Sequence, residues 1–497
     1  MKTRSYLLLA ALILGPAARG VGPPGSPSAA IAGPTKAEYR DRRRALMEQI
    51  RVAEAAGSVL RSSLLRAEGG SGPASSGAAG VVVALVGRGE PTEDAKFRQE
   101  NDFWYLTGID APHAALILWP ESGDEALYLP PRNPRQERWV GPRPSPGPES
   151  ASGLGFARVE SSASFLGDLF RAIGDPGVGR PSTAATVYLI EAQPLPASTT
   201  GAARFARFVR EGAATARFKE LAATVHEMRK AKSEAEVALI RRAVAVTADA
   251  QEAVARLIRP EIPEYRLEGA ILGAFTSGGA RRAGFPSIVG SGPNSTVLHY
   301  GRNDRTITPG DLVVVDIGGE VEGYTADITR TYPADGRFTP RQREVYALVL
   351  AAQREAERAF RPGQTNLAAL NATVRDFLKG SPLRARGDDG TERTMDQFFI
   401  HGLGHHLGLD VHDVGDNSKP LEPGAVFTIE PGLYLPSEGF GVRIEDDYRV
   451  TKDGLDKLSG SIPSDPDEVE GRIARLRAQK MPSAPPSAPA PATSTTP

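Results

Sequence analysis

Five residues that can bind metal ions stand out in this sequence: Asp316, Asp327, His405, Glu430 and Glu445. Together they form a set rich in carboxylates, whose mutual repulsion and burial would be costly unless cations neutralised it. Oxygen ligands with one imidazole suit hard or borderline divalent ions such as Mn²⁺, Co²⁺ or Zn²⁺. Two such ions a few ångströms apart can turn water into a nucleophile. The set therefore indicates a two-metal hydrolase.

Asp316 and Asp327 occur in two strand-like segments that are close in the sequence. Asp316 ends the β-branched run that starts at Leu312, and Asp327 lies within residues 323–332. Apolar runs bounded by glycines are typical of buried strands. The short link predicts an antiparallel pair, in which a glycine bulge could aim both carboxylates at one side. Either Asp taken alone could instead belong to an ordinary surface hairpin.

Four of the seven His residues fall between positions 401 and 412, one of them being His406. Glycines at 402, 404 and 408 favour a loop whose backbone can approach a site closely, and they weaken a helix. A His cluster by itself could also be structural or an adventitious metal site.

Glu430 and Glu445 lie in apolar, strand-like contexts as well. Glu430 follows Phe427-Thr-Ile, and Glu445 lies in a segment where Val and Ile favour a strand over a solvated turn. Arg443 and Glu445 share one face of that strand, because side chains alternate with a period of two. We therefore expect an Arg–carboxylate contact that orients a metal ligand.

These blocks, in this order, resemble those of the aminopeptidase P and prolidase family of metallopeptidases. The resemblance covers roughly residues 225–460 and extends upstream to residues 98–108, Arg-Gln-Glu-Asn-Asp-Phe-Trp-Tyr-Leu-Thr-Gly. Methionine aminopeptidases share the pita-bread fold but lack that upstream segment. The resemblance implies an α/β protein, in which an α+β pita-bread (creatinase/aminopeptidase) catalytic domain follows a smaller amino-terminal α/β domain.

The resemblance also implies a role for each matching residue. The metal ligands, which would hold two divalent ions per chain with Mn²⁺ as the first choice, are Asp316, Asp327, His405, Glu430 and Glu445. The residues implied to be catalytic are His299, His401, His412 and Glu430. Those implied to bind substrate are Trp104, His299 and Arg443, while Tyr434 and Arg443 would orient ligands. His406 departs from the bacterial enzymes, which carry an aromatic residue there.

The activity implied by the resemblance is release of the first residue from peptides with proline in second position. Peptides would be the substrates, and the aromatic segment around Trp104 would line the site of a neighbouring subunit in a dimer or tetramer. A dipeptidase limited to Xaa-Pro is the alternative, which sequence separates poorly. A peptide-binding module that has lost its ligands is disfavoured, because all five ligand positions are filled.

The composition limits the partners and the chemistry. The chain has 497 residues with 59 Lys and Arg against 60 Asp and Glu, so it lacks the basic excess that nucleic-acid binding would need. It has no Cys, which excludes disulfides, thiol catalysis and thiolate metal ligands.

The two ends of the chain differ from its middle. Residues 1–20 combine a basic start, an apolar core and small residues, which is typical of a signal peptide for export to a periplasm or beyond. The apolar core is too short to span a bilayer stably, so no lasting membrane insertion is expected after cleavage. Residues 21–35 and 481–497 are rich in Pro, Ala, Gly, Ser and Thr, and we expect both to be disordered.

Between these ends we expect an amino-terminal α/β domain over residues 36–215 and a catalytic domain over 225–460. The first should contain a helix over 36–66, strands at 81–86 and 114–119, and a loop over 142–155. The second should begin with a long helix whose capping box is Ser233 and Glu236, and it should contain a helix over 340–360 and a loop insertion at 384–394.

Overall fold

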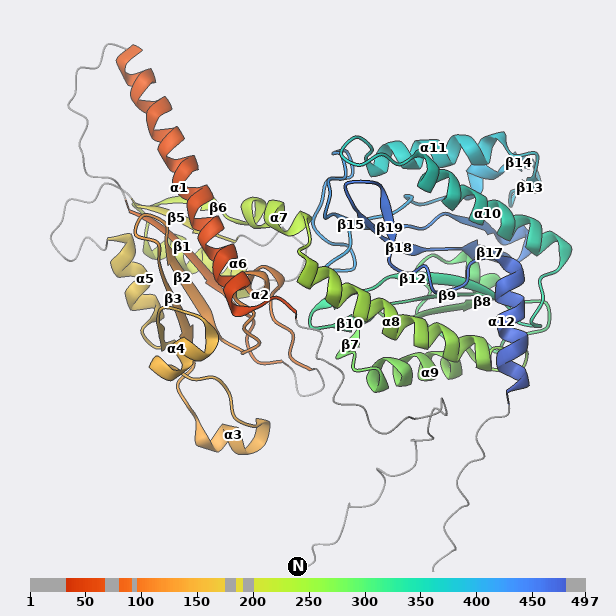
Figure 1. The fold of residues 1–497 in the computed structure, drawn as a ribbon, viewed down its shortest axis with the longest axis horizontal. Coiled ribbons are helices and arrows are strands. Elements are labelled where there is room, and N and C mark those ends of the chain that lie inside the picture. The colour runs from red at the N-terminus through yellow and green to blue at the C-terminus, as the bar shows by residue number, and fades with distance from the viewer. Residues whose placement is uncertain (1–32, 68–79, 92–95, 175–184, 191–200, 480–497) are drawn as a thin grey trace, which may run out of the picture.

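The computed structural model describes residues 33–67, 80–91, 96–174, 185–190 and 201–479, which form a smaller and a larger body joined near α7 (Figure 1). The expected signal peptide, residues 21–32 and the expected tail at 481–497 lie outside the described residues. Among the residues described, no helix is both long enough and apolar enough to cross a membrane.

The smaller body is built on a six-stranded mixed sheet in the order β4-β3-β2-β1-β5-β6. Strand β1 is apolar throughout because both its faces are covered: alternate residues pack with Leu46 and Ile50 of α1 on one side and with α5 and α6 on the other. The strands are β1 (Val81–Val86), β2 (Ala115–Trp119), β3 (Asp124–Leu129), β4 (Val159–Ser161), β5 (Thr186–Leu189) and β6 (Arg217–Glu220). The helices are α1 (Lys36–Ala67), α2 (Asn101–Thr107), α3 (Pro134–Val140), α4 (Pro148–Leu154), α5 (Phe165–Ile173) and α6 (Gly201–Gly212). Strand β6 takes the sheet beyond residue 215.

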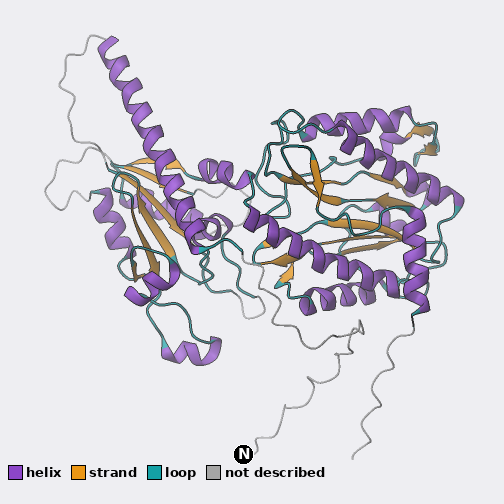
Figure 2. Cartoon of the chain, viewed as in Figure 1, coloured by secondary structure: helices purple, strands orange, loops and turns teal. Residues whose placement is uncertain are grey.

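In the larger body, helices lie on both sides of a layer of short strands (Figure 2). The helices are α7 (Ala222–Lys230), α8 (Glu234–Leu257), α9 (Glu264–Ser277), α10 (Pro340–Ala359), α11 (Leu367–Gly380) and α12 (Pro466–Ala478). The first strands are β7 (Arg282–Ala283), β8 (Ile288–Ser291), β9 (Leu312–Ile317), β10 (Gly319–Val321), β11 (Tyr324–Thr325) and β12 (Ile328–Pro333). The later strands are β13 (Arg384–Arg386), β14 (Glu392–Thr394), β15 (Val426–Ile429), β16 (Gly432–Leu435), β17 (Phe440–Arg443), β18 (Asp446–Val450) and β19 (Leu455–Lys457).

The expected antiparallel pair is formed by β9 and β12, whose register places Asp316 opposite Thr329. Asp327 directly precedes β12 and so lies between strands rather than within one. Gln251 of α8 holds both strands of the hairpin, since its amide donates to the carbonyl oxygens of Val315 at 3.2 Å and of Ile328 at 3.0 Å. The helix thus anchors the backbone beside both carboxylates.

Most expected elements are confirmed, and two expected loops are wrong. Helices α1, α8 and α10 and strands β1 and β2 occur where the sequence predicted them, and Ser233 and Glu236 form the capping box. Residues 142–155 contain helix α4, which Pro148 begins and Gly155 ends with φ of 77°. Residues 384–394 form the hairpin β13–β14. For α4 the reason is that proline at the first helical position and glycine just after the last are ordinary helix boundaries, although both residues are also common in loops.

Candidate active site

The five predicted metal ligands line one cavity of about 250 Å³ in the larger body. Four of them lie at strand ends: Asp316 in β9, Asp327 before β12, Glu430 after β15 and Glu445 between β17 and β18. His405 comes from the irregular loop that precedes β15. A Cβ atom on Gly404 would lie 2.0 Å from the Thr428 carbonyl oxygen, so glycine is needed for this loop to approach the strand.

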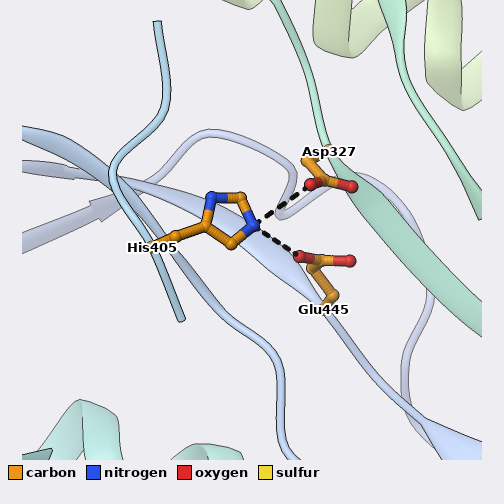
Figure 3. Close-up of side chains that lie close together, drawn as sticks. All are labelled: Asp327, His405 and Glu445. Carbon is orange, nitrogen blue, oxygen red and sulfur yellow. Dashed lines mark ion pairs between the residues drawn. The ribbon is translucent and has the colours of Figure 1, made fainter. Parts of the chain in front are cut away.

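Three side chains come close enough to share one cation (Figure 3): Asp327, His405 and Glu445, whose ligand atoms lie within 4.8 Å of one another. His405 Nε2 is 3.3 Å from Asp327 Oδ2 and 3.9 Å from Glu445 Oε1. The same nitrogen is 3.5 Å from Glu430 Oε1. The imidazole therefore faces three carboxylates at once.

Asp327, Glu430 and Glu445 resist ionisation in the metal-free chain. Burial, followed by repulsion from Asp316, raises the pKa of Asp327 well above its ordinary value. Burial and the charge of Asp327 do the same to the pKa of Glu445. Burial raises the pKa of Glu430 to about 7. Positive charge placed among them would relieve this repulsion.

The donor set fits divalent metal ions. One buried oxygen on each of three carboxylates has no hydrogen-bond partner: Asp316 Oδ1, Asp327 Oδ1 and Glu445 Oε1. Buried polar atoms without partners are rare and need an explanation, of which a bound ion is one. Asp316, Asp327, His405, Glu430 and Glu445 could together hold such ions.

The orientation of His405 leaves one ring nitrogen free for a ligand. His405 Nδ1 lies 3.1 Å from the carbonyl oxygen of His406, which can only accept, so Nδ1 carries the proton. The other nitrogen, Nε2, points at the carboxylates. Metal-binding imidazoles are commonly oriented in this way by a carbonyl behind them.

The buried Arg443 side chain forms hydrogen bonds with several residues around the cavity. Its Nη2 donates to Asp316 Oδ2 at 2.7 Å, so the expected Arg–carboxylate contact is made with Asp316 rather than with Glu445. Its Nη1 donates to the Tyr434 hydroxyl at 2.9 Å, and its Nε donates to Thr329 Oγ1 at 3.1 Å. One planar guanidinium therefore fixes three groups around the cavity, a geometry that lysine could not reproduce.

His401 is held as a neutral ring at the cavity wall. Its Nδ1 lies 2.7 Å from the Gly402 carbonyl oxygen and donates to it, so Nε2 accepts the Tyr434 hydroxyl proton at 2.8 Å. Burial and then the charge of Arg443 lower the pKa of His401 to about 4. Tyr434 thus relays a hydrogen bond from Arg443 to His401.

The other two predicted catalytic His residues also line the cavity. His299 and His412 are both exposed to it, and the ring centroids of His412 and His405 are 4.2 Å apart. Burial lowers the pKa of His412 from its ordinary value. Trp104, in contrast, is not among the residues that line this cavity; it packs in α2 with its ring centroid 6.4 Å from that of Tyr39.

Two residues with evident roles escaped the sequence analysis, Thr329 and Asp447. Thr329 Oγ1 donates to Glu445 Oε2 at 2.7 Å while accepting from Arg443. The carboxylate of Asp447 accepts from the backbone N–H of Asp327 at 3.2 Å. Thr329 lies two residues after Asp327, so strand alternation could have placed both on one face; no local pattern indicates the contact of Asp447.

Comparison with known proteins gives consistent results for both bodies. Residues 238–452 match metallopeptidase family M24, and residues 39–170 match the aminopeptidase P N-terminal domain. The Xaa-Pro aminopeptidase of Escherichia coli K12 is 36% identical over 77% of this chain and 90% of its own length, and that of Haemophilus influenzae is 35% identical over 75% and 88%. The solved structure of proline aminopeptidase P II from Yersinia pestis is similar with a TM-score of 0.73 and 33% identity, covering 89% of this chain and all of that one. A zinc-substituted E. coli aminopeptidase P in complex with product is similar with a TM-score of 0.73 and 31% identity, over 90% and 99%.

Proposed function

Since the chain belongs to the aminopeptidase P family of M24 metallopeptidases, we propose that it is a two-metal Xaa-Pro aminopeptidase acting on tripeptides and longer peptides. The family resemblance and the pita-bread catalytic domain are confirmed. The observation that carries the proposal is the set of three partnerless carboxylate oxygens on residues that line one cavity with His405.

The residues that would hold two divalent ions are Asp316, Asp327, His405, Glu430 and Glu445. Mn²⁺ is the first choice for so many oxygen ligands, with Co²⁺ or Zn²⁺ as alternatives. When bound, the ions would act as Lewis acids on the scissile carbonyl and on the attacking water.

The chain's own groups would position the peptide and move protons. Glu430 faces the cavity beside His405 and would carry a proton to the leaving nitrogen. His412 would donate to the oxygen of the scissile carbonyl as charge develops there. His401 could share this role only by turning its one ring N–H away from the Gly402 carbonyl oxygen, to which it now donates. His299 and Arg443 would lie near the proline ring.

Selectivity for proline follows from the shape of that residue. A peptide bond to proline has no N–H and a fixed ring, so a site shaped for it disfavours other residues. Replacing proline by alanine in the peptide should lower kcat/KM at least about tenfold, since a shaped apolar pocket discriminates by roughly 1–3 kcal/mol.

The test compares Xaa-Pro dipeptides, Xaa-Pro-Xaa tripeptides and Met-Ala-Xaa peptides on one preparation. Cleavage of tripeptides with a free amino terminus is expected. Cleavage confined to dipeptides would support a prolidase instead, and preference for Met-Ala-Xaa would overturn the proline selectivity.

Two further proposals concern location and assembly. The composition of residues 1–20 supports export by a signal peptide, with the mature chain starting near Val21. Amino-terminal sequencing of the protein from its native cell tests this, and an intact Met1 on a cytoplasmic protein would contradict it.

Assembly into a dimer or tetramer is supported by helix α3, which buries none of its residues in the described part of its own chain. Trp139 is 85% exposed and Val140 53%, an unusual cost for a monomer. Trp104→Ala and Trp139→Ser should be compared by analytical ultracentrifugation and peptide kinetics. If neither variant changes assembly or kinetics, the predicted roles of Trp104 and of this helix in a subunit contact do not hold.

A further inference from the structure

A buried row of charged side chains connects the N-terminal domain to the loop that carries His412. Arg229 of α7 donates from Nη1 to Asp102 Oδ1 of α2 at 2.7 Å and from Nη2 to Asp413 Oδ1 at 2.5 Å. Lys232 Nζ donates to Asp413 Oδ2 at 3.0 Å. We call Asp102, Arg229, Asp413 and Lys232 the interdomain charge row.

The row is shielded from solvent, so its contacts are strong constraints. The side chains of Asp413 and Lys232 are each 1% exposed, that of Arg229 is 4% and that of Asp102 is 6%. Burial alone would raise the pKa of Asp413, but Lys232 and Arg229 lower it below the ordinary value. A buried charge whose partner is removed is strongly destabilising, which keeps such a row in one arrangement.

Other residues of the same N-terminal segment hold the same loop. Arg98 donates from Nη2 to the Leu409 carbonyl oxygen, and Asn101 Nδ2 donates to Asp410 Oδ2 at 2.5 Å. The segment 98–102 therefore contacts the loop directly at Leu409 and Asp410, and Asp102 reaches it at Asp413 through Arg229. This is the segment whose resemblance to the family extended into the N-terminal domain, and its polar residues have no other role in the proposed chemistry.

Asp413 is the point where these constraints reach the active site. It directly follows His412, both of its carboxylate oxygens are held, and its backbone N–H donates to the His406 carbonyl oxygen at 2.9 Å. The His412 ring lies against His405 in the cavity. Movement of Asp413 would therefore displace His412 relative to the metal ligands.

We propose that Asp413 is a positioning residue for peptide cleavage, which fixes His412 in the cavity, and that Arg229 and Asp102 extend this constraint into the N-terminal domain. The inference rests on the aminopeptidase activity, not on the identity of the metal. It makes the N-terminal domain part of the support of the active site in its own chain.

The test uses two variants that keep side-chain shape and remove charge, Asp413→Asn and Asp102→Asn. For an Xaa-Pro-Xaa tripeptide, Asp413→Asn should lower kcat by about 10-fold to 100-fold, the scale expected for a misplaced catalytic group. KM and the metal content should stay close to those of the unmutated enzyme. Asp102→Asn, which is more remote, should lower kcat by about threefold to tenfold. The double variant should be no worse than Asp413→Asn, since both changes act through one row.

The matched control is Glu125→Gln, which removes the charge from another buried Arg–carboxylate pair. Glu125 binds Arg43 at 2.6 Å inside the N-terminal domain, with side-chain exposures of 8% and 1%. Among the described residues, the hydrogen bonds of its carboxylate all come from Arg43 and none from the His412 loop. This variant should lose stability and keep kcat.

Hydrogen exchange supplies a readout that does not depend on activity. Amides of residues 405–413 should exchange faster in Asp102→Asn than in the unmutated protein, and their exchange rates should be unchanged in Glu125→Gln. This result is expected even if the unmutated enzyme proved to cleave other peptides. Unaltered kcat and loop exchange in Asp102→Asn would overturn the proposal. So would equal losses of kcat in Asp102→Asn and Glu125→Gln, or multiplicative losses in the double variant. Should Asp413→Asn fail to fold, Asp102→Asn decides by the same measurements.

Discussion

Glu445 and Asp446 are neighbours in the sequence and both are buried, yet their surroundings are opposite. The carboxylate of Asp446 accepts from Arg330 at 2.7 Å, from Ser459 at 2.6 Å and from Gln353 at 3.0 Å, and it pairs with Lys457 at 2.8 Å. Glu445 accepts from Thr329 through one oxygen, while its Oε1 has no partner.

The two pKa values differ in the same sense. Burial opposes ionisation of both residues, but Arg330 and Lys457 lower the pKa of Asp446, whereas the acidic neighbours of Glu445 raise its pKa further. A carboxylate that stabilises the fold has its hydrogen-bond capacity filled by groups of the chain itself. A carboxylate that binds a ligand, here called an open carboxylate, keeps an oxygen without a partner in the chain, and this destabilises the fold until the ligand binds.

Removal of bound metal ions is expected to have the largest effect on activity. Chelation should lower peptidase activity by more than about two orders of magnitude, because the open carboxylates then lack the cations they are arranged to hold. Mn²⁺ or a similar ion should restore it. Activity and metal content of the purified protein check this, with circular dichroism as a control for folding. Full activity with less than one ion per chain would contradict the two-metal site.

Substitution of the two neighbours should separate the two kinds of carboxylate. Glu445→Gln, like Asp327→Asn, should cost at least about 100-fold in kcat/KM while the protein stays folded. Asp446→Asn should instead destabilise the fold by about 3–5 kcal/mol, since it leaves the fully buried Arg330 without its carboxylate partner. Urea unfolding and peptide kinetics measure both. Equal losses of stability in the two variants would remove the distinction.

Arg443→Lys tests whether activity depends on the hydrogen bonds that the Arg443 guanidinium makes to several groups around the cavity. Lysine keeps the charge but cannot bond Asp316, Tyr434 and Thr329 together, so kcat/KM should fall about tenfold or more. Arg341→Lys is the control, because Arg341 pairs with Glu438 at the partly exposed edge of the domain. An unchanged kcat/KM in Arg443→Lys would show that charge alone is sufficient.

The smallest effect is expected in the pH dependence of stability. In the metal-free protein the pKa of Glu430 is raised from 4.5 to about 7, so between these values the folded state binds more protons than the unfolded state. The contribution of Glu430 to the free energy of unfolding should therefore fall as the pH rises through this window. Comparison of urea midpoints for the metal-free unmutated protein and metal-free Glu430→Gln at about pH 5 and about pH 7.5 measures it, together with the change that loss of the Glu430 charge makes to Asp327 and Glu445. An identical pH dependence in both proteins would contradict the assignment.

Local patterns predicted much of this molecule. The β-branched run ending at Asp316 gave the β9–β12 hairpin, and Ser233 with Glu236 gave the start of α8, because each signal is contained in a few adjacent residues. The ligand types indicated a metal-binding cluster, and all five residues line one cavity in the structure.

Contacts between distant segments were beyond local patterns. Asp447 accepts a hydrogen bond from the backbone N–H of Asp327, and Arg443 donates to Asp316 rather than to Glu445. Neither contact could be predicted, because both depend on how separate hairpins pack. Trp104 was expected at a substrate site, but its indole packs beside Tyr39 and contributes nothing to the cavity wall of its own chain. Its predicted place at a neighbouring subunit stays a prediction.

The strand ends that supply the carboxylates are spread from Asp316 to Glu445, with no pair of them adjacent in the sequence. An unfolded chain therefore offers no preformed site, and any ion that binds the native arrangement shifts the folding equilibrium by mass action. The stability of the larger domain is then a joint property of the polypeptide and of the free ion concentration around it.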